Sequence, residues 1–325
     1  MTAKTTKSGA NALMKANKSR VFHKSNDISE STIRESMPEV LKMLLVDRTR
    51  STAKRVKNII WANDNYIRFG NEAYAPTAQI LPELVTGTMD SVIMPRALKP
   101  RKLQKKRTKA KAEVFTPTWM VRKQNNAVDQ RYIDDDLEMY VNRIWLEITC
   151  GEAPYMVSRY DMETGATIPL ADRVGFIDRK LRRINAAAND VSEWQRLVES
   201  AYKASYGFEW NGDSVLLARE NLLYTYRDYF VAKWSVLPSQ KQFQTIAEII
   251  SYNVFQMDGL KYIIPLSETV TKVSNTQLSL FDEVETDEKW TVRPGKRVKV
   301  MNWDTNKMEF FDKGMHNHER RQNQN

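Results

Sequence analysis

The spacing of hydrophobic residues changes along the chain from a helical pattern near the N-terminus to alternating strand and helix patterns in the middle. Apolar residues recur at intervals of three and four between Met37 and Leu45, which predicts a helix from about Ser29. Val56, Ile59 and Ile60 predict a second helix. Residues 62–95 carry Gly and Pro without a clear period. We therefore expect a mainly helical N-terminal region over residues 28–95.

The middle of the chain, residues 113–266, has the pattern of an α/β domain. Short apolar runs predict strands at 144–149, 206–209 and 253–257, and a long apolar stripe predicts a helix over 215–234. Ser239 and Gln242 form a capping box that predicts the start of another helix. Strands that alternate with helices are typical of a parallel sheet, so the expected fold class is α/β.

The rest of the chain is polar. We expect a disordered basic tail over 1–27, a basic linker over 96–112, a flexible linker over 267–292, a hairpin over 293–313 that turns at 304–306, and a disordered tail over 314–325.

Composition sets the class of protein. A hydrophobic content of 42% with eight tryptophans is that of a globular chain. No stretch approaches the ~20 apolar residues that a membrane span needs, and no secretory signal follows Lys4 and Lys7. The single cysteine excludes an internal disulfide, and three histidines form no metal-ligand cluster. These features predict a cytoplasmic protein without a bound metal or a membrane partner.

Positive charge is clustered rather than spread. The net charge is +10, and residues 96–111 hold nine basic and no acidic side chains. Such a run favours nucleic acid, although a solvated linker is the alternative. The candidate DNA contacts are Arg101, Lys102, Lys105, Lys106, Arg107 and Lys109. Residues 158–200 are also rich in arginine, and they either contact DNA phosphates or cover the sheet.

Acidic residues stand at the ends of the three predicted strands. The first strand runs through Glu147 into the small-residue turn Thr149-Cys150-Gly151, and Glu209 and Asp258 follow the other two strands. Cofactors bind at the carboxyl ends of strands in open α/β sheets, where a carboxylate can accept ribose hydroxyls. We expect Glu147 to hold an amino group, Glu209 a ribose and Asp258 an adenine ring.

These elements, in this order, resemble adenine-specific DNA methyltransferases of restriction–modification systems, and most closely their methylase (M) subunits. Glu113–Val121 resembles the family's Phe-x-x-Pro or Phe-Thr-Pro element, and Leu146–Tyr155 its first cofactor motif. The resemblance covers about half of the chain. It implies a Rossmann-like class I methyltransferase fold with an N-terminal helical and basic extension and a C-terminal hairpin. It also implies that S-adenosyl-L-methionine is bound by Phe115, Thr116 and Pro117 with the strand-end residues.

The chain departs from the family at the site for the target base. The family places Asp/Asn/Ser-Pro-Pro-aromatic at its fourth strand, whereas none of the eleven prolines here are adjacent. Ala153 also stands where many relatives have Gly. No catalytic residue is therefore assigned. Another chain supplies the base pocket, or the protein binds the cofactor without transferring methyl groups, or other residues carry the chemistry.

The acidic linker contains a short peptide of another kind. Gln277, Leu278, Leu280 and Phe281 match the pentapeptide by which many bacterial replication and repair proteins bind the sliding clamp. The alternative is that these apolar residues pack on the domain as an edge strand.

The sequence thus predicts a DNA methyltransferase acting on a base amino group, in a bacterial or phage-infected cell, with DNA and a restriction or specificity subunit as partners. The alternatives are an inactive accessory protein recruited to the clamp, and an enzyme acting on another substrate such as RNA.

Overall fold

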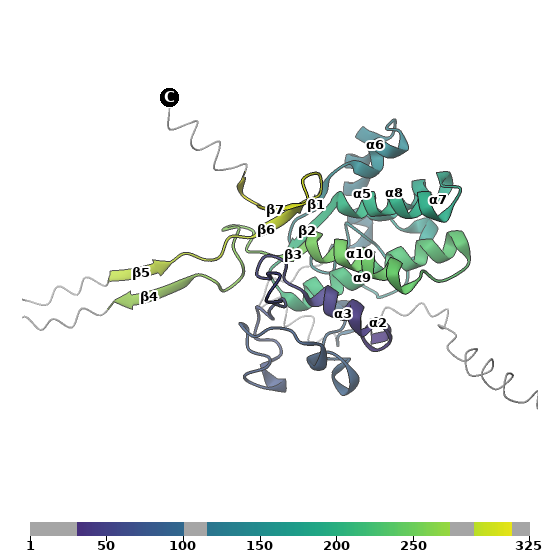
Figure 1. Cartoon of the computed structure of the whole chain (residues 1–325). Helices are drawn as coiled ribbons and strands as arrows, with labels where there is room; N and C mark the ends of the chain where they lie inside the picture. Colours follow the sequence, from purple (N-terminus) through teal and green to yellow (C-terminus); the bar gives the residue numbers. More distant parts are fainter. Residues whose placement is uncertain (1–30, 101–115, 274–288, 314–325) are drawn as a thin grey trace, which may run out of the picture.

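A computed structural model of the chain describes residues 31–100, 116–273 and 289–313, with the element order shown in Figure 1. The α-helices are α2 (Ser31–Ser36), α3 (Pro38–Leu45), α5 (Thr118–Asp129), α6 (Leu137–Asn142), α7 (Phe176–Ala187), α8 (Val191–Lys203), α9 (Gly212–Trp234) and α10 (Gln240–Asn253). Short 3-10 turns are η1 (Ile67–Phe69), η2 (Pro82–Leu84), η3 (Gly87–Met89), η4 (Arg96–Leu98), η5 (Gln130–Tyr132) and η6 (Leu170–Asp172). In the described part of the chain, no helix is long and apolar enough to cross a membrane.

Three parallel strands form the central sheet within the described residues. They are β1 (Trp145–Glu147), β2 (Ser205–Glu209) and β3 (Val254–Gln256), in the order β1-β2-β3. Helices α7 and α8 connect β1 to β2, and α9 and α10 connect β2 to β3. The predicted α/β class with a parallel sheet is confirmed. The capping box of Ser239 and Gln242 is also confirmed at the start of α10.

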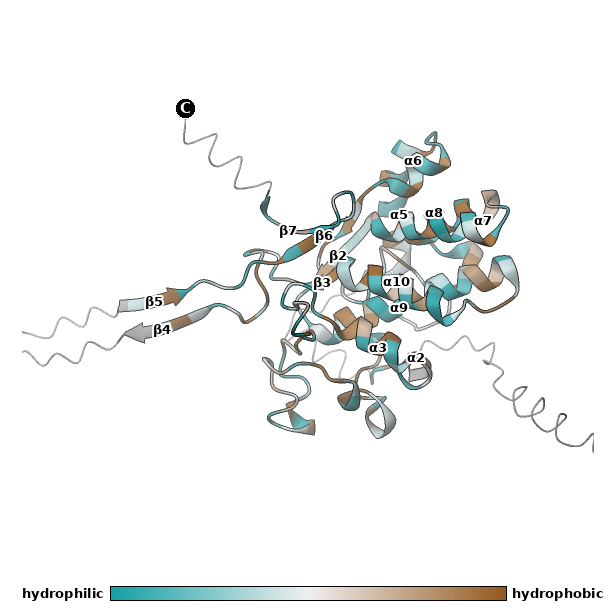
Figure 2. Cartoon of the chain, viewed as in Figure 1, coloured by the Kyte–Doolittle hydropathy of each residue, from teal (hydrophilic) through white to brown (hydrophobic). Residues whose placement is uncertain are grey.

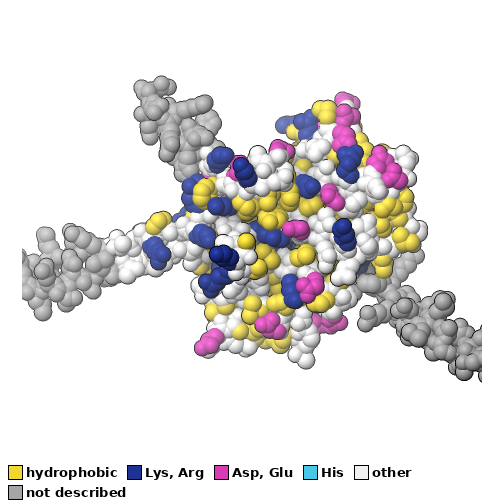
Figure 3. Space-filling view, viewed as in Figure 1, with side chains coloured by type: hydrophobic (Ala, Val, Ile, Leu, Met, Phe, Trp, Pro, Cys, Tyr) yellow, Lys and Arg dark blue, Asp and Glu magenta, His cyan; other side chains and the backbone are white. Residues whose placement is uncertain are grey.

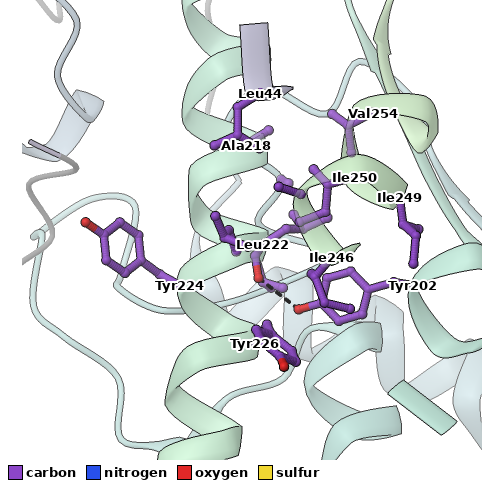
Figure 4. Packing of buried hydrophobic residues seen from close by; sticks show 14 of the residues in the cluster. Leu44, Tyr202, Ala218, Leu222, Tyr224, Tyr226, Ile246, Ile249, Ile250 and Val254 are labelled. Carbon is purple, nitrogen blue, oxygen red and sulfur yellow. Dashed lines mark hydrogen bonds between the residues drawn. The ribbon is translucent and has the colours of Figure 1, made fainter. Parts of the chain in front are cut away.

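Helices α7 to α10 build the main hydrophobic core on one face of this sheet. α9 is buried along most of its length because other elements surround it (Figure 4). Its Leu222 packs among Ile246 and Ile250 of α10, and Tyr202 of α8 donates a 2.8 Å hydrogen bond to the Leu222 carbonyl. Leu44 of α3 belongs to the same core, so the N-terminal region and the α/β region share one core.

The predicted C-terminal hairpin, β6 (Lys299–Asn302) and β7 (Lys307–Phe310), is confirmed and lies against the other face of the sheet. Phe208 of β2 and Phe255 of β3 form a second apolar cluster with Val298 and Phe311, which flank the hairpin. The hydroxyl of Tyr206 also donates to the Met301 carbonyl at 3.1 Å. The sheet is therefore covered on both faces at β2 and β3.

The second predicted helix, at Val56 to Ile60, is wrong. This segment is extended, with isolated bridges from Val46 to Asn58 and from Ile60 to Gln79, and Val56 is exposed. Most of the N-terminal region after α3 is likewise irregular. The apolar spacing reflects burial of Ile59 and Ile60 against distant segments rather than a helical face.

Part of the expected flexible linker is a two-stranded antiparallel ribbon, β4 (Thr269–Val273) and β5 (Lys289–Arg293). The ribbon projects from the body of the molecule, and hydrophobic segments show on both of its strands (Figure 2). Val270 pairs with Val292 across it, and both side chains are exposed. The β-branched residues of these strands favour such pairing.

The arginines of residues 158–200 are held by the protein itself. Arg173 donates to Asp228 at 2.8 Å and Arg179 to Asp129 at 2.7 Å, while Arg182 donates to the backbone carbonyl of Arg173. Of the two interpretations of this region, the structure supports the one in which it covers the sheet.

Candidate functional site

A cavity of about 1080 Å³ lies at the carboxyl ends of β1 and β2 and extends along β1. Its walls come from β1 and the turn after it, the end of β2, α5, and the N-terminal segment around Asn63. The cavity is large enough for a cofactor-sized ligand. Five of the candidate cofactor residues lie on its wall with Thr116, namely Glu147, Thr149, Cys150, Gly151 and Glu209.

Glu209 connects the two strand ends. One carboxylate oxygen accepts the Gly151 amide at 3.0 Å, and the other accepts the amides of Trp210 and Asn211 at 2.9 and 3.1 Å. This carboxylate therefore fixes the turn after β1 against the end of β2. The second oxygen also accepts the Asn211 side-chain amide at 3.2 Å, so the oxygen bonded to Gly151 is the one that retains capacity for a ligand hydroxyl.

Glu147 also holds the turn after β1 in place. Its two oxygens accept the backbone amides of Tyr155 at 3.1 Å and Met156 at 2.8 Å. The side chain is buried, but it still borders the cavity. Glu147 thus organises the backbone of the turn and places an ionisable carboxyl on the cavity wall.

Burial raises the pKa of both carboxyls. Burial raises the pKa of Glu147 to about 8, and the nearby charge of Glu209 adds to the rise although two backbone amides oppose it. Burial likewise raises the pKa of Glu209, with a further contribution from Asp213. Two buried acidic groups at neighbouring strand ends favour a ligand that carries positive charge.

The turn between Glu147 and Tyr155 has an unusual backbone. Thr149, Gly151 and Ala153 all have positive φ angles, of 46°, 54° and 63°. Such angles disfavour residues with a Cβ atom, above all a β-branched one, and they cluster where backbone meets a ligand. The Cys150 thiol is buried, and burial raises its pKa well above the usual value, so it is a packing group rather than a nucleophile.

Helix α5 supplies a wall that the sequence did not indicate. Pro117 caps α5, and Gln124, Asn125 and Val128 line the cavity about two and three turns further along. Asn125 donates to the carbonyls of Tyr155 and Val174, both at 3.0 Å, which fixes α5 against the turn after β1. The adjacent polar residues Gln124 and Asn125 were the feature of the sequence that could have indicated this wall.

The N-terminal segment also reaches the cavity. Asn63 donates to Asp213 at 3.0 Å and to Asn211 at 3.2 Å, and it lines the cavity beside the end of β2. Residues 62–95 show no clear hydrophobic period or motif, and these contacts join positions about 150 residues apart.

Asp258 does not line this cavity. Its carboxylate accepts the amides of Leu260 and Lys261 at 2.9 and 3.1 Å and so closes its own turn after β3. The adenine role expected for Asp258 therefore has no support from this geometry. Phe115, the basic residues 101–109 and the clamp-like residues 277–281 lie outside the described residues.

The described side chains contain no group of three or more His, Cys, Asp or Glu residues that could hold a metal ion. Comparisons with protein families, with curated proteins and with solved structures give no match to this chain.

Proposed function

We propose that this chain has a Rossmann-like class I methyltransferase fold and binds S-adenosyl-L-methionine in the cavity at the ends of β1 and β2. One observation carries the proposal. A single cavity is lined by four residues that are spread over 93 positions of the sequence, Thr116, Glu147, Gly151 and Glu209. They are the residues that the resemblance assigns to this cofactor.

The chemistry of the cavity fits this ligand. S-adenosyl-L-methionine carries a sulfonium and an amino group, and the two buried carboxyls can supply the opposite charge by ionising when it binds. Glu209 stands where a carboxylate can accept ribose hydroxyls, and the turn at Gly151 lets backbone approach closely. When bound, the cofactor would supply an electrophilic methyl group, and the protein's residues would hold and orient it.

Calorimetric titration with S-adenosyl-L-methionine tests the proposal. Glu209→Gln should weaken binding by about tenfold or more, because it removes one charge and one acceptor from the wall. Glu163→Gln, on an exposed loop, is the matched control and should bind as the wild type does. Wild-type protein that shows no binding, while melting cooperatively, would contradict the proposal.

We further propose that the protein acts on DNA, at the amino group of adenine. Besides the basic run at 96–111, a second basic segment lies within the described residues. Lys54, Arg55 and Lys57 stand close together in sequence beside Arg48 and Arg50, which are ion-paired with Glu248 and Asp47. Thr49 exchanges hydrogen bonds of 3.1 Å with the backbone of Lys299 in β6. Lysine and arginine side chains gather on this part of the surface in Figure 3.

Phosphate contacts at this basic segment would make binding depend on salt. Reversing the charges of the exposed Lys54 and Arg55 with Glu should weaken DNA binding and reduce the slope of log affinity against log salt by about two. The double variant Arg196→Glu and Lys241→Glu, at exposed positions of α8 and α10, changes the net charge by the same amount and serves as control. An unchanged slope would exclude this segment from the interface.

A second candidate is a cofactor-binding accessory protein without transferase activity. The observation that favours it is the lack of adjacent prolines in the chain, which leaves the target-base pocket unaccounted for. Transfer of labelled methyl from S-adenosyl-L-methionine to DNA separates the two. Binding without transfer supports the accessory function, in which Gln277–Phe281 would recruit the protein to the sliding clamp, or a restriction or specificity subunit would complete the enzyme.

A further inference from the structure

The ribbon formed by β4 and β5 leaves the body of the molecule and is exposed on both of its faces (Figure 1). All side chains of residues 269–271 and of residues 290–293 are exposed. A two-stranded ribbon with no layer against it is at best marginally stable in water. A partner that covers one face would therefore stabilise this ribbon.

Hydrogen bonds fix the root of the ribbon to the rest of the chain. The Ile264 amide donates to the Lys296 carbonyl at 2.8 Å, and the Lys296 amide donates to the hydroxyl of Ser267 at 2.8 Å. A Cβ atom on Gly295 would clash with the side chain of Ile263, so the chain is closely packed at this point. The body of the molecule thus fixes the direction in which the ribbon leaves it.

The two faces of the ribbon differ in chemistry, because side chains alternate along each strand. Hydroxyl, methyl and guanidinium groups share one face, which we call the threonine face, on Thr269, Thr271, Thr291 and Arg293. Thr269 is paired with Arg293, and Thr271 with Thr291, so these groups lie side by side across the two strands. The opposite face carries Trp290 and the paired Val270 and Val292.

The root of the ribbon is basic. Residues 289–303 contain five basic and no acidic residues. Within the described part of the chain, the side chains of Arg293 and Lys296 are exposed and form no ion pair. The bonds between Thr49 and Lys299 bring the basic segment proposed for DNA beside this root, and lysine and arginine side chains surround it in Figure 3.

We propose that the threonine face of the ribbon lies in the major groove of duplex DNA and reads its sequence, with Arg293 bound to a guanine. The inference rests on the proposed function, which supplies DNA as the partner. Charge favours DNA over a protein as the occupant, because the ribbon continues a basic surface suited to phosphate. The acidic residues within 282–288 belong to the connection between the strands, so a polyanion approaches the root, where Arg293 stands.

The shape and the side chains of the threonine face fit this groove. The major groove of B-DNA is about 12 Å wide and admits a two-stranded ribbon. Arginine donates two hydrogen bonds to O6 and N7 of guanine. Threonine contacts bases through its hydroxyl, and thymine through its methyl group. The ribbon therefore presents groups that distinguish one base pair from another.

Exchanging threonine and valine on the two faces tests which face meets the DNA. The double variant Thr271→Val and Thr291→Val removes two hydroxyls from the threonine face and keeps the charge and the preference for strands. The reverse exchange at the adjacent pair, Val270→Thr and Val292→Thr, is the matched control. The wild type should enrich a sequence motif from a pool of random duplexes. The first variant should bind that motif about tenfold more weakly, and the control should bind as the wild type does.

Arg293→Lys tests the contact with guanine. Lysine keeps the charge but lacks the paired donors of arginine, so the variant should lose the preference for guanine at one position and keep the dependence on salt. Replacing that guanine with 7-deazaguanine removes the N7 acceptor from the major groove. This replacement should weaken binding of the wild type about tenfold and binding of Arg293→Lys very little. Circular dichroism establishes that all variants are folded.

The outcomes separate this proposal from the proposed function. A wild type that binds no duplex would overturn both. A wild type that binds DNA without enriching a motif, or whose motif is bound equally well by the threonine-face variant and by Arg293→Lys, would overturn the role of the ribbon alone. The apolar face with Trp290 would then be left for a protein partner. A loss of affinity confined to the valine-face control would also contradict the proposal, because it would place the contact on the other face.

Discussion

Under the proposed function, the raised pKa of Glu147 should make the affinity for S-adenosyl-L-methionine depend on pH. Burial raises the pKa of this carboxyl to about 8 in the ligand-free protein. A cationic ligand favours the ionised form, so binding must remove the proton wherever the carboxyl is still protonated. We therefore expect affinity to rise as the pH rises toward 8.

The size of the effect follows from the populations. The ionised fraction of a carboxyl with a pKa of about 8 is about half at pH 8 and about 1% at pH 6, and apparent affinity falls in proportion. The amino group of the ligand has an ordinary pKa of about 8 and loses its charge above that pH. Affinity should therefore peak near pH 8 and be roughly twentyfold weaker at pH 6.

Calorimetry in buffers of different ionisation enthalpy measures both the affinity and the number of protons released on binding. At pH 7, close to one proton should leave per ligand bound. Glu147→Gln removes the titrating group, so its weaker binding should show no loss below pH 8. An affinity that stays constant from pH 6 to 8, or proton uptake on binding, would refute the reasoning.

The same pKa sets the stability of the ligand-free protein. The carboxyl stays protonated in the folded chain up to about pH 8, whereas the unfolded chain releases this proton near pH 4.5. Between these values the folded state holds more protons, so stability should fall as the pH rises. Thermal melts should show the ligand offsetting this fall.

Three other predictions concern the scaffold. Burial lowers the pKa of Lys180 to about 7, so the folded chain releases this proton before the unfolded chain, and stability should rise with pH between 7 and 10.5; Lys180→Met should remove that rise in thermal melts. Gly212→Ala should cost about 1–3 kcal/mol in urea unfolding, because its Cβ would meet the Ile60 carbonyl oxygen at 2.0 Å, and an unchanged midpoint would argue against that contact. Ser239→Ala should cost about 1 kcal/mol by removing the α10 cap, whereas the neighbouring exposed Gln240→Ala should cost little.

Local patterns in the sequence were enough to predict the central helices and strands. The capping box at Ser239, the stripe of α9 and the three apolar strands each depend on residues within a few positions of one another. The order of strand ends then placed Glu147, Gly151 and Glu209 in one cavity, because parallel strands present their carboxyl ends at the same edge.

Long-range contacts explain what the sequence did not show. The segment at Ile60 resembles a helix by spacing, but its backbone N–H and C=O bond to the side chain of Gln256 at 2.7 and 2.9 Å. The side-chain amide of Gln256 thus takes the place of a neighbouring strand. Because it lies 196 positions away in the sequence, the residues around Ile60 carry no pattern that predicts it. Asn63 and Asn125 reach the cavity through contacts of the same kind.

The buried carboxylates of this protein differ in one physical respect that bears on function. Burial raises the pKa of Asp228, but the guanidinium groups of Arg159, Arg173 and Arg227 lower it below its usual value overall. Asp228 is thus a buried acid whose charge is compensated by cations, although the pKa values of the structural Asp178 and Glu220 remain raised by burial. Glu147 and Glu209 are bonded mainly by backbone amides, and their pKa values are raised. The incomplete compensation of Glu147 costs stability near neutral pH, and a cation brought by a ligand would remove that cost.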